Sequence, residues 1–242
     1  MECWAKDISR CEGPQSGEHY VSRGLIGTGS VKMKGLPFCE DELVEIPLSG
    51  LKANILCKRH NELLAPLDAE AKRFKNSVVW DATSSQAPPR STHIDGWLFG
   101  RWMAKTYCNF MTLGKQPLDS DFARFAFDRE PSNEYRVYAW FPMFREAKRL
   151  GLVQSTPADH FQFNYLHDLP AIIVYIRFFG LRFVLSNIDC KRRPLLEFGD
   201  RLTIDARDLN TPSRFVLRRN LGGGQASAQY EILLDWTANT KQ

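Results

Sequence analysis

The chain has 242 residues, of which 43% are hydrophobic and 25% are charged, and its net charge is +4. This composition is typical of globular proteins and suffices for one large domain or two small ones, while the mild positive charge permits nucleic-acid binding without arguing for it. The N-terminus carries charges instead of the apolar run of a secretory signal, and the most apolar stretch, residues 169–185, contains two arginines, so we expect a soluble, cytoplasmic protein without a membrane partner.

Residues 1–75 contain the most informative cysteines and histidines. The spacing Cys57-x-x-His60 is that of half a tetrahedral zinc site. Cys3 and Cys11 are the nearest pair that can complete it, although their seven-residue gap is longer than the usual two to four, and Cys39 can replace one of them. Because the chain is neither small nor visibly secreted, a disulfide framework is disfavoured. We expect a structural Zn²⁺ at Cys3, Cys11, Cys57 and His60.

Polar residues of the types used in hydrolysis are interleaved with these ligands. Glu18 and His19 are adjacent, Asn54 shortly precedes Cys57, and Asn61 follows His60. In this order the residues resemble the zinc-stapled form of the HNH (ββα-metal) endonuclease family, over residues 1 to about 75. The chain departs from the family pattern in having Glu18 instead of Asp, His60 instead of a second Cys, a long gap before Asn54, and Leu64 where Lys or Arg is common.

The resemblance implies metal-dependent hydrolysis of phosphodiester bonds in DNA, in a phage, phage-defence or restriction context. It implies that His19 is the general base, that Asn54 orients the His19 imidazole, and that Glu18 and Asn61 coordinate a catalytic Mg²⁺ or Mn²⁺. The alternative is a catalytically inactive zinc-binding module that binds nucleic acid or a protein partner.

The stretch 81–92, rich in Ser, Thr and Pro, predicts a linker. After it, the pattern of apolar residues predicts a helix over 93–113, capped by Thr92 and ended by Gly114. Farther on, β-branched and aromatic runs between turn residues predict strands at 134–140, 171–179, 181–188, 200–206, 214–219 and 229–236.

The fold class expected is therefore α+β. We place a small zinc-stapled ββα-metal HNH domain at 1–80 and a second α+β domain with a mainly antiparallel sheet at 93–242. The second domain would serve recognition, sensing or dimerisation, including a homodimer contact. Residues 1–75 hold 11 Lys or Arg and 11 Asp or Glu, so the basic excess lies after them. Lys191, Arg192 and Arg193 are the candidate nucleic-acid contacts there, although basic residues on edge strands also serve only to prevent aggregation.

Overall fold

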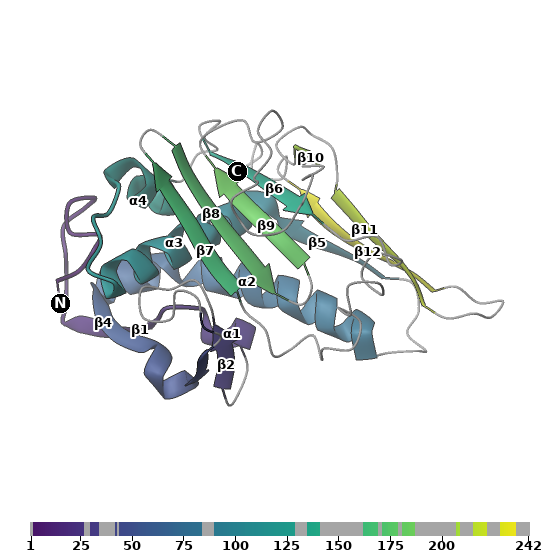
Figure 1. Ribbon diagram of the computed structural model, residues 1–242, viewed down its shortest axis with the longest axis horizontal. Helices are drawn as coiled ribbons and strands as arrows, with labels where there is room; N and C mark the ends of the chain where they lie inside the picture. The colour runs from purple at the N-terminus through teal and green to yellow at the C-terminus, as the bar shows by residue number, and fades with distance from the viewer. Residues whose placement is uncertain are drawn as a thin grey trace.

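The computed structural model of the protein describes residues 2–26, 30–33, 42, 44–83, 90–128, 135–140, 162–168, 171–178, 181–186, 207–208, 215–221 and 228–235. The elements of the first third are β1 (Gln15–His19), α1 (Arg23–Ile26), β2 (Ser30–Met33), β3 (Val44–Pro47), the 3₁₀ turn η1 (Leu48–Leu51), β4 (Lys52–Cys57) and α2 (Lys58–Thr83). Strand β1 pairs antiparallel with β4, and α2 follows β4 directly. This part of the chain is therefore a ββα unit (Figure 1).

The remaining described elements are β5 (Arg90–Asp95), α3 (Gly96–Leu113), α4 (Ser120–Phe127), β6 (Arg136–Trp140), β7 (Gln162–Asp168), β8 (Ala171–Phe178), β9 (Leu181–Ser186), β10 (Arg207–Asp208), β11 (Phe215–Leu221) and β12 (Ala228–Asp235). An antiparallel sheet has the order β10-β6-β9-β8-β7. A second sheet has the order β11-β12-β5, in which β5 and β12 are parallel. The α+β class agrees with the expectation from sequence.

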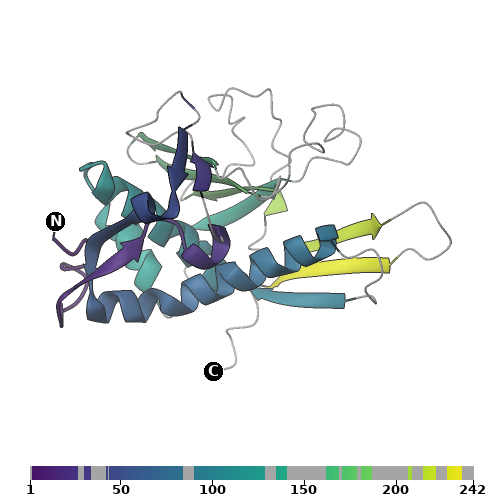
Figure 2. The same ribbon diagram turned by 90° about the horizontal axis from the view of Figure 1, so that it is seen from below.

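Helix α2 is the longest described element and connects the two ends of the molecule. It has 26 residues, begins at the antiparallel pair β1–β4 and extends toward the sheet formed by β5, β11 and β12 (Figure 2). We call the β1–β4 pair the hairpin, although residues 20–51 separate its two strands in the sequence. Among the described residues, no helix has both the length and the hydropathy needed to cross a bilayer.

Aromatic side chains join α2 to the rest of the core. Phe74 of α2 lies 5.0 Å from Phe99 of α3 and 5.5 Å from Phe183 of β9, measured between ring centroids. Phe99 also contacts Trp102, at 5.4 Å. All four side chains are at most 2% exposed, so the buried contacts cross the boundary that the sequence predicts between 1–80 and 93–242.

Two sequence expectations for the middle of the chain are wrong in detail. The helix predicted from residue 93 begins at Gly96, because residues 90–95 form β5, and its N-cap is Asp95 instead of Thr92. The Asp95 carboxylate accepts hydrogen bonds from the backbone N–H groups of Trp97 (2.9 Å) and Leu98 (3.1 Å). The end at Gly114 is confirmed.

Residues 81–83 and 90–92 of the predicted linker belong to α2 and β5, and residues 84–89 lie outside the described ranges.

The predicted strands at 134–140, 171–179, 181–188, 214–219 and 229–236 correspond to β6, β8, β9, β11 and β12, within two residues at each end. The strand predicted at 200–206 lies outside the described residues. Strand β7 was not expected from the sequence, and it pairs along its whole length with β8.

Candidate functional site

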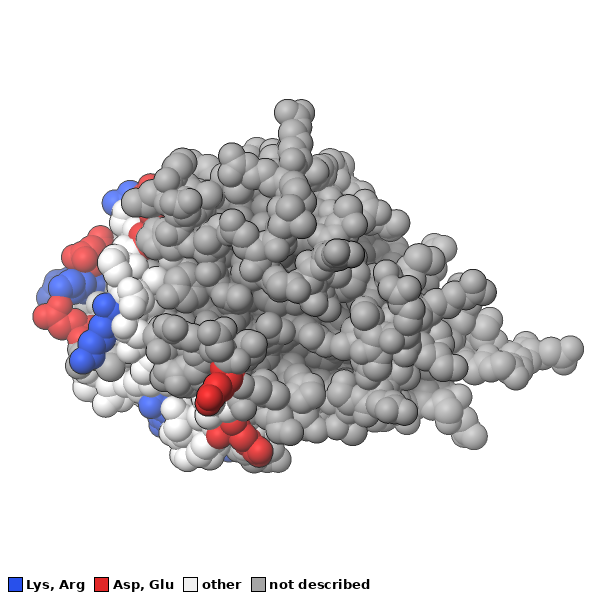
Figure 3. Space-filling view, in the orientation of Figure 1, with Lys and Arg blue, Asp and Glu red and all other residues white. Residues whose placement is uncertain are grey.

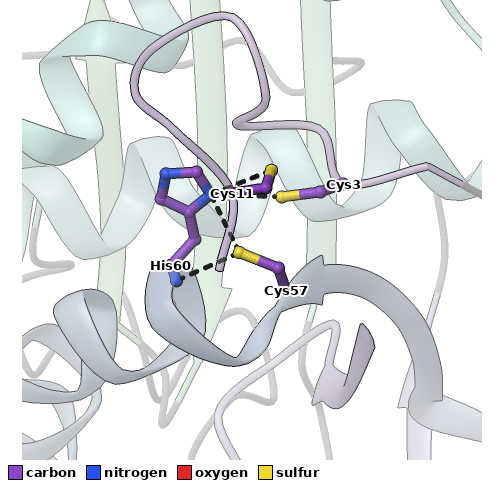
Figure 4. A group of neighbouring side chains, drawn as sticks. All are labelled: Cys3, Cys11, Cys57 and His60. Carbon is purple, nitrogen blue, oxygen red and sulfur yellow. Dashed lines mark hydrogen bonds between the residues drawn. The ribbon is translucent and has the colours of Figure 1, made fainter. Parts of the chain in front are cut away.

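Three thiols and one imidazole converge where the hairpin meets α2. The Cys3, Cys11 and Cys57 sulfurs lie 3.3, 3.8 and 3.3 Å from Nδ1 of His60, and the four ligand atoms are all within 4.8 Å of one another (Figure 4). Cys3, Cys57 and His60 are buried, whereas Cys11 is exposed. The structure thus brings together the four residues predicted as zinc ligands, and Cys39 lies outside the described residues. We call these four residues the Cys3–His60 cluster.

Backbone hydrogen bonds hold the N-terminal loop against the start of α2. The Trp4 N–H donates to the carbonyl of Ile55 in β4 (3.0 Å), which places Cys3 beside Cys57. The first two N–H groups of α2, those of Lys58 and Arg59, donate to the carbonyls of Pro14 (2.9 Å) and Glu12 (3.3 Å). The first turn of a helix has no partners for these donors within the helix, so docking the loop satisfies them and positions Cys11.

Gly13 permits the close approach of this loop. Its φ of +75° is in the left-handed region that glycine adopts without strain, and a Cβ at this position would lie 3.1 Å from Cβ of Lys58. A larger residue at position 13 would therefore move the loop away from α2, and Cys11 with it.

The charges at the cluster suit a cation. Burial alone would raise the pKa of Cys57, but hydrogen bonds from backbone N–H groups, first that of His60, and from the other thiols lower it overall. The sulfur of Cys11 faces the cluster, where burial and the thiols of Cys3 and Cys57 raise the pKa of Cys11 to about 12. The thiols are thus close enough to affect one another's pKa, and a bound cation would favour the thiolate form of each.

The cluster geometry fits a tetrahedral ion. Bonds of about 2.3 Å to sulfur and about 2.0–2.1 Å to nitrogen at the tetrahedral angle separate the sulfur and nitrogen ligands by about 3.6 Å. The observed separations of 3.3, 3.8 and 3.3 Å bracket this value. Among the described residues, this is the single group of three or more His, Cys, Asp or Glu side chains arranged to hold a metal ion.

His19 lies at the other end of the hairpin. Gln15 pairs with Cys57 at the cluster end of β1, and His19 pairs with Lys52 at the far end. Asn54 pairs with Gly17, so His19, Lys52 and Asn54 share one face of the hairpin, since directly paired residues point to the same side. A Cβ at Gly17 would collide with Cε of Lys52, so the Lys52 side chain lies over this face.

The surroundings of His19 favour its neutral form. Burial lowers the pKa of His19, and the positive charges of Lys52 and Arg23 lower it further, against the opposing effect of Asp68. A neutral imidazole can accept a proton. The two cations beside it provide positive charge for an anionic ligand.

Glu18 points to the other face of β1 and is 4% exposed. Its Oε1 accepts from the Lys105 ammonium at 2.7 Å, and this ammonium also donates to Oδ2 of Asp68 at 2.6 Å. Burial raises the pKa of the Glu18 carboxyl, and the charge of Lys105 offsets this only in part. Asp68 in turn accepts from the hydroxyl of Ser22, which accepts from the Trp102 indole at 2.8 Å.

The two side chains expected to hold a catalytic ion are each engaged elsewhere. The Asn61 amide donates to Oγ of Ser16 at 2.8 Å, and Ser16 is three residues, or about 10 Å along the strand, from His19. Among the described residues, no hydrogen bond connects Glu18 with Asn61. Asp68 of α2 is the acid whose negative charge raises the pKa of both His19 and Glu18. The arrangement therefore does not fit a catalytic ion held by Glu18 and Asn61, and that ion remains a prediction of the resemblance.

Sequence reasoning missed Lys105, Asp68 and Lys52. Asp68 follows Asn61 by seven residues, a spacing that places both on one face of a helix, and this was the available signal. Lys105 is in a helix of mostly apolar residues and is 1% exposed, and a charge at such a position is usually paired. Nothing in the sequence indicated which acid would be its partner.

The nucleic-acid contacts predicted at Lys191, Arg192 and Arg193 lie outside the described residues. In Figure 3, basic and acidic side chains of the described residues lie next to one another at the left edge of the face, and further acidic side chains lie at its lower centre. Comparison with protein-family models, curated proteins and solved structures found no match.

Proposed function

We propose that the chain is an HNH-type endonuclease that hydrolyses phosphodiester bonds in DNA, with a structural Zn²⁺ bound by the Cys3–His60 cluster. The observation that supports this most directly is the ββα unit itself. A hairpin is followed without a break by a helix, a thiol and imidazole cluster lies at their junction, and His19 ends the first strand. The order of these parts is the one expected of the family that the sequence resembles, although the gap between His19 and Asn54 is longer.

In this proposal His19 takes the proton from the attacking water, because its neutral imidazole is the form that accepts a proton. Asn54, on the same face of the hairpin, orients the imidazole. Lys52 and Arg23 neutralise charge on the phosphate, in place of the Lys or Arg that Leu64 replaces. A divalent ion, when bound, would supply further charge neutralisation at the phosphate.

His19→Ala is expected to abolish cleavage of supercoiled plasmid DNA in the presence of Mg²⁺ or Mn²⁺, a loss of at least about 100-fold, because general base catalysis contributes about 10²–10⁴ in rate. Nicked and linear products are measured by gel electrophoresis, with EDTA as the metal-free reference. The matched control is His93→Ala, since His93 is an exposed histidine of β5, far along the chain from the hairpin. Cleavage by His19→Ala at the wild-type rate would refute the role of His19.

The pH dependence of cleavage gives a second test. A base with a lowered pKa is neutral, and therefore active, down to lower pH than an ordinary histidine. We expect kcat/KM to rise with pH through a midpoint below about 6.5, the ordinary pKa of histidine, and to be level at pH 7. Lys52→Ala removes one of the charges that lower this pKa, so its midpoint should move to higher pH. A midpoint above 7 in the wild type would contradict the assignment.

The alternative function, an inactive zinc-binding module that binds nucleic acid or a protein partner, is favoured by the state of Glu18. Glu18 is buried against the Lys105 ammonium, which also binds the carboxylate of Asp68. This is the arrangement expected if Glu18 has become part of the core. The module predicts stoichiometric zinc and no cleavage with any divalent ion, in wild type and His19→Ala alike. Binding of DNA without cleavage, measured by fluorescence anisotropy, would then favour the module.

A further inference from the structure

We propose that Ser9 is a positioning residue for the metal centre, and that it fixes His60 as a ligand through Nδ1. The inference rests on the proposed binding of metal by the Cys3–His60 cluster. Oγ of Ser9 lies 2.7 Å from Nε2 of His60, on the side of the ring opposite the three sulfurs. Both ring nitrogens of a completely buried histidine therefore have a partner.

The roles of the two nitrogens follow from the chemistry of the ring. A neutral imidazole carries its proton on one nitrogen and a lone pair on the other. Nδ1 faces the sulfurs of Cys3, Cys11 and Cys57, so the metal takes its lone pair, and the proton belongs on Nε2. That proton needs an acceptor, which is Oγ of Ser9. Partners of this kind fix the tautomer and orientation of a metal-binding histidine.

Packing supports the same orientation of the ring. Phe127, the last residue of α4, contacts the His60 ring edge to face, with centroids 5.4 Å apart and planes at 70°. This contact limits rotation of the imidazole on one side, while the hydrogen bond to Ser9 limits it on another. Two restraints from different segments thus hold a single ring orientation.

The position of Ser9 accounts for the unusual spacing of the first ligand pair. It lies in the seven-residue stretch between Cys3 and Cys11, the gap that exceeds the common spacing of two to four. Within this stretch the chain turns, with Lys6 N–H donating to the Cys3 carbonyl and Ile8 N–H to the Ala5 carbonyl. The extra residues therefore allow the loop to reach the outer nitrogen of His60 before it returns to Cys11.

The test compares Ser9→Ala with Ser9→Thr, which retains the hydroxyl, and with Ser16→Ala. Ser16 is the matched control because it is a half-buried serine that bonds to Asn61, in the first turn of α2, instead of to His60. Affinity for Co²⁺ and Zn²⁺ is measured by competition with a chelator. Ser9→Ala should bind each metal about 10–100-fold more weakly, the usual effect of losing such a partner, while Ser9→Thr and Ser16→Ala stay close to wild type.

A spectroscopic readout separates a positioning role from a general loss of stability. In zinc-loaded protein with ¹⁵N-labelled histidine, NMR should show His60 with its proton on Nε2 and its metal on Nδ1. The proposal is overturned if the proton is on Nδ1, or if Ser9→Ala binds metal as tightly as wild type. If neither wild type nor Ser9→Ala binds metal, the proposed metal site fails as well. If the wild type binds zinc but does not cleave DNA, the endonuclease proposal is refuted and the proposed role of Ser9 still stands.

Discussion

Cys57→Ser is expected to eliminate stoichiometric zinc and to cause the largest loss of stability among single substitutions near the hairpin. Cys57 ends β4 and contacts His60 in the first turn of α2, so in the proposed metal centre it supplies a ligand at the junction of β4 and α2. Loss of a structural metal is among the few single changes that reach about 4–5 kcal/mol. For a chain of this length, that lowers the melting temperature by about 8–20 °C.

Zinc content per chain and thermal unfolding are the measurements, each with and without a chelator. Cys108→Ser is the matched control, because Cys108 is a fully buried thiol of α3 outside the cluster. Burial, and after it the negative charge of Asp119, raises the pKa of Cys108 well above its ordinary value, in contrast to the lowered pKa of Cys57. Cys108→Ser should retain its zinc, and the chelator should lower its melting temperature as it lowers that of the wild type.

If a chelator left the melting temperature of the wild type unchanged, the Cys3–His60 cluster would be a group of packed thiols instead of a metal centre. The same conclusion would follow if Cys57→Ser and Cys108→Ser were equally destabilised and held equal zinc.

Lys105→Met is expected to destabilise the protein by about 3–5 kcal/mol, the usual effect of removing one member of a buried ion pair. The substitution retains the length and apolar stem of the side chain but leaves the buried Glu18 carboxylate without its cation. Asp68 is partly exposed and recovers some hydration, so most of the effect should come from Glu18. Because α3 carries Lys105 and β1 carries Glu18, the pair connects the hairpin to the core of the rest of the chain.

Chemical denaturation measures this effect, and Lys72→Met is its control, since Lys72 is an exposed lysine of α2. Adding Glu18→Gln to Lys105→Met removes the buried charge that lacks a partner, so the double variant should be more stable than Lys105→Met alone. If Lys105→Met and the wild type were equally stable, the ion pair would contribute nothing to the free energy of unfolding. If the double variant were less stable than Lys105→Met, the unpaired Glu18 carboxylate would not be the cause of the destabilisation.

The sequence by itself determined the local parts of this protein. Ligand spacing indicated Cys57 and His60, because two ligands three residues apart at a helix start can face one ion. Alternating β-branched and aromatic residues indicated most strands of the second half, and Gly114 indicated the end of α3. These features depend on a few neighbouring residues, so their physical causes are visible in the sequence.

Tertiary structure alone decided the features that depend on distant residues. Residues 90–95 form β5 instead of the first turn of a helix because they pair with β12, with Arg90 opposite Tyr230. Docking of Trp4 on Ile55 brings Cys3 to Cys57. Glu18 became the partner of Lys105 because α3 packs against the hairpin. The energies of such contacts come from segments that meet only in the folded chain. The sequence could therefore name Cys3 as a candidate ligand by its residue type, but no local pattern indicated the pairing of β5 with β12 or the ion pair of Glu18 with Lys105.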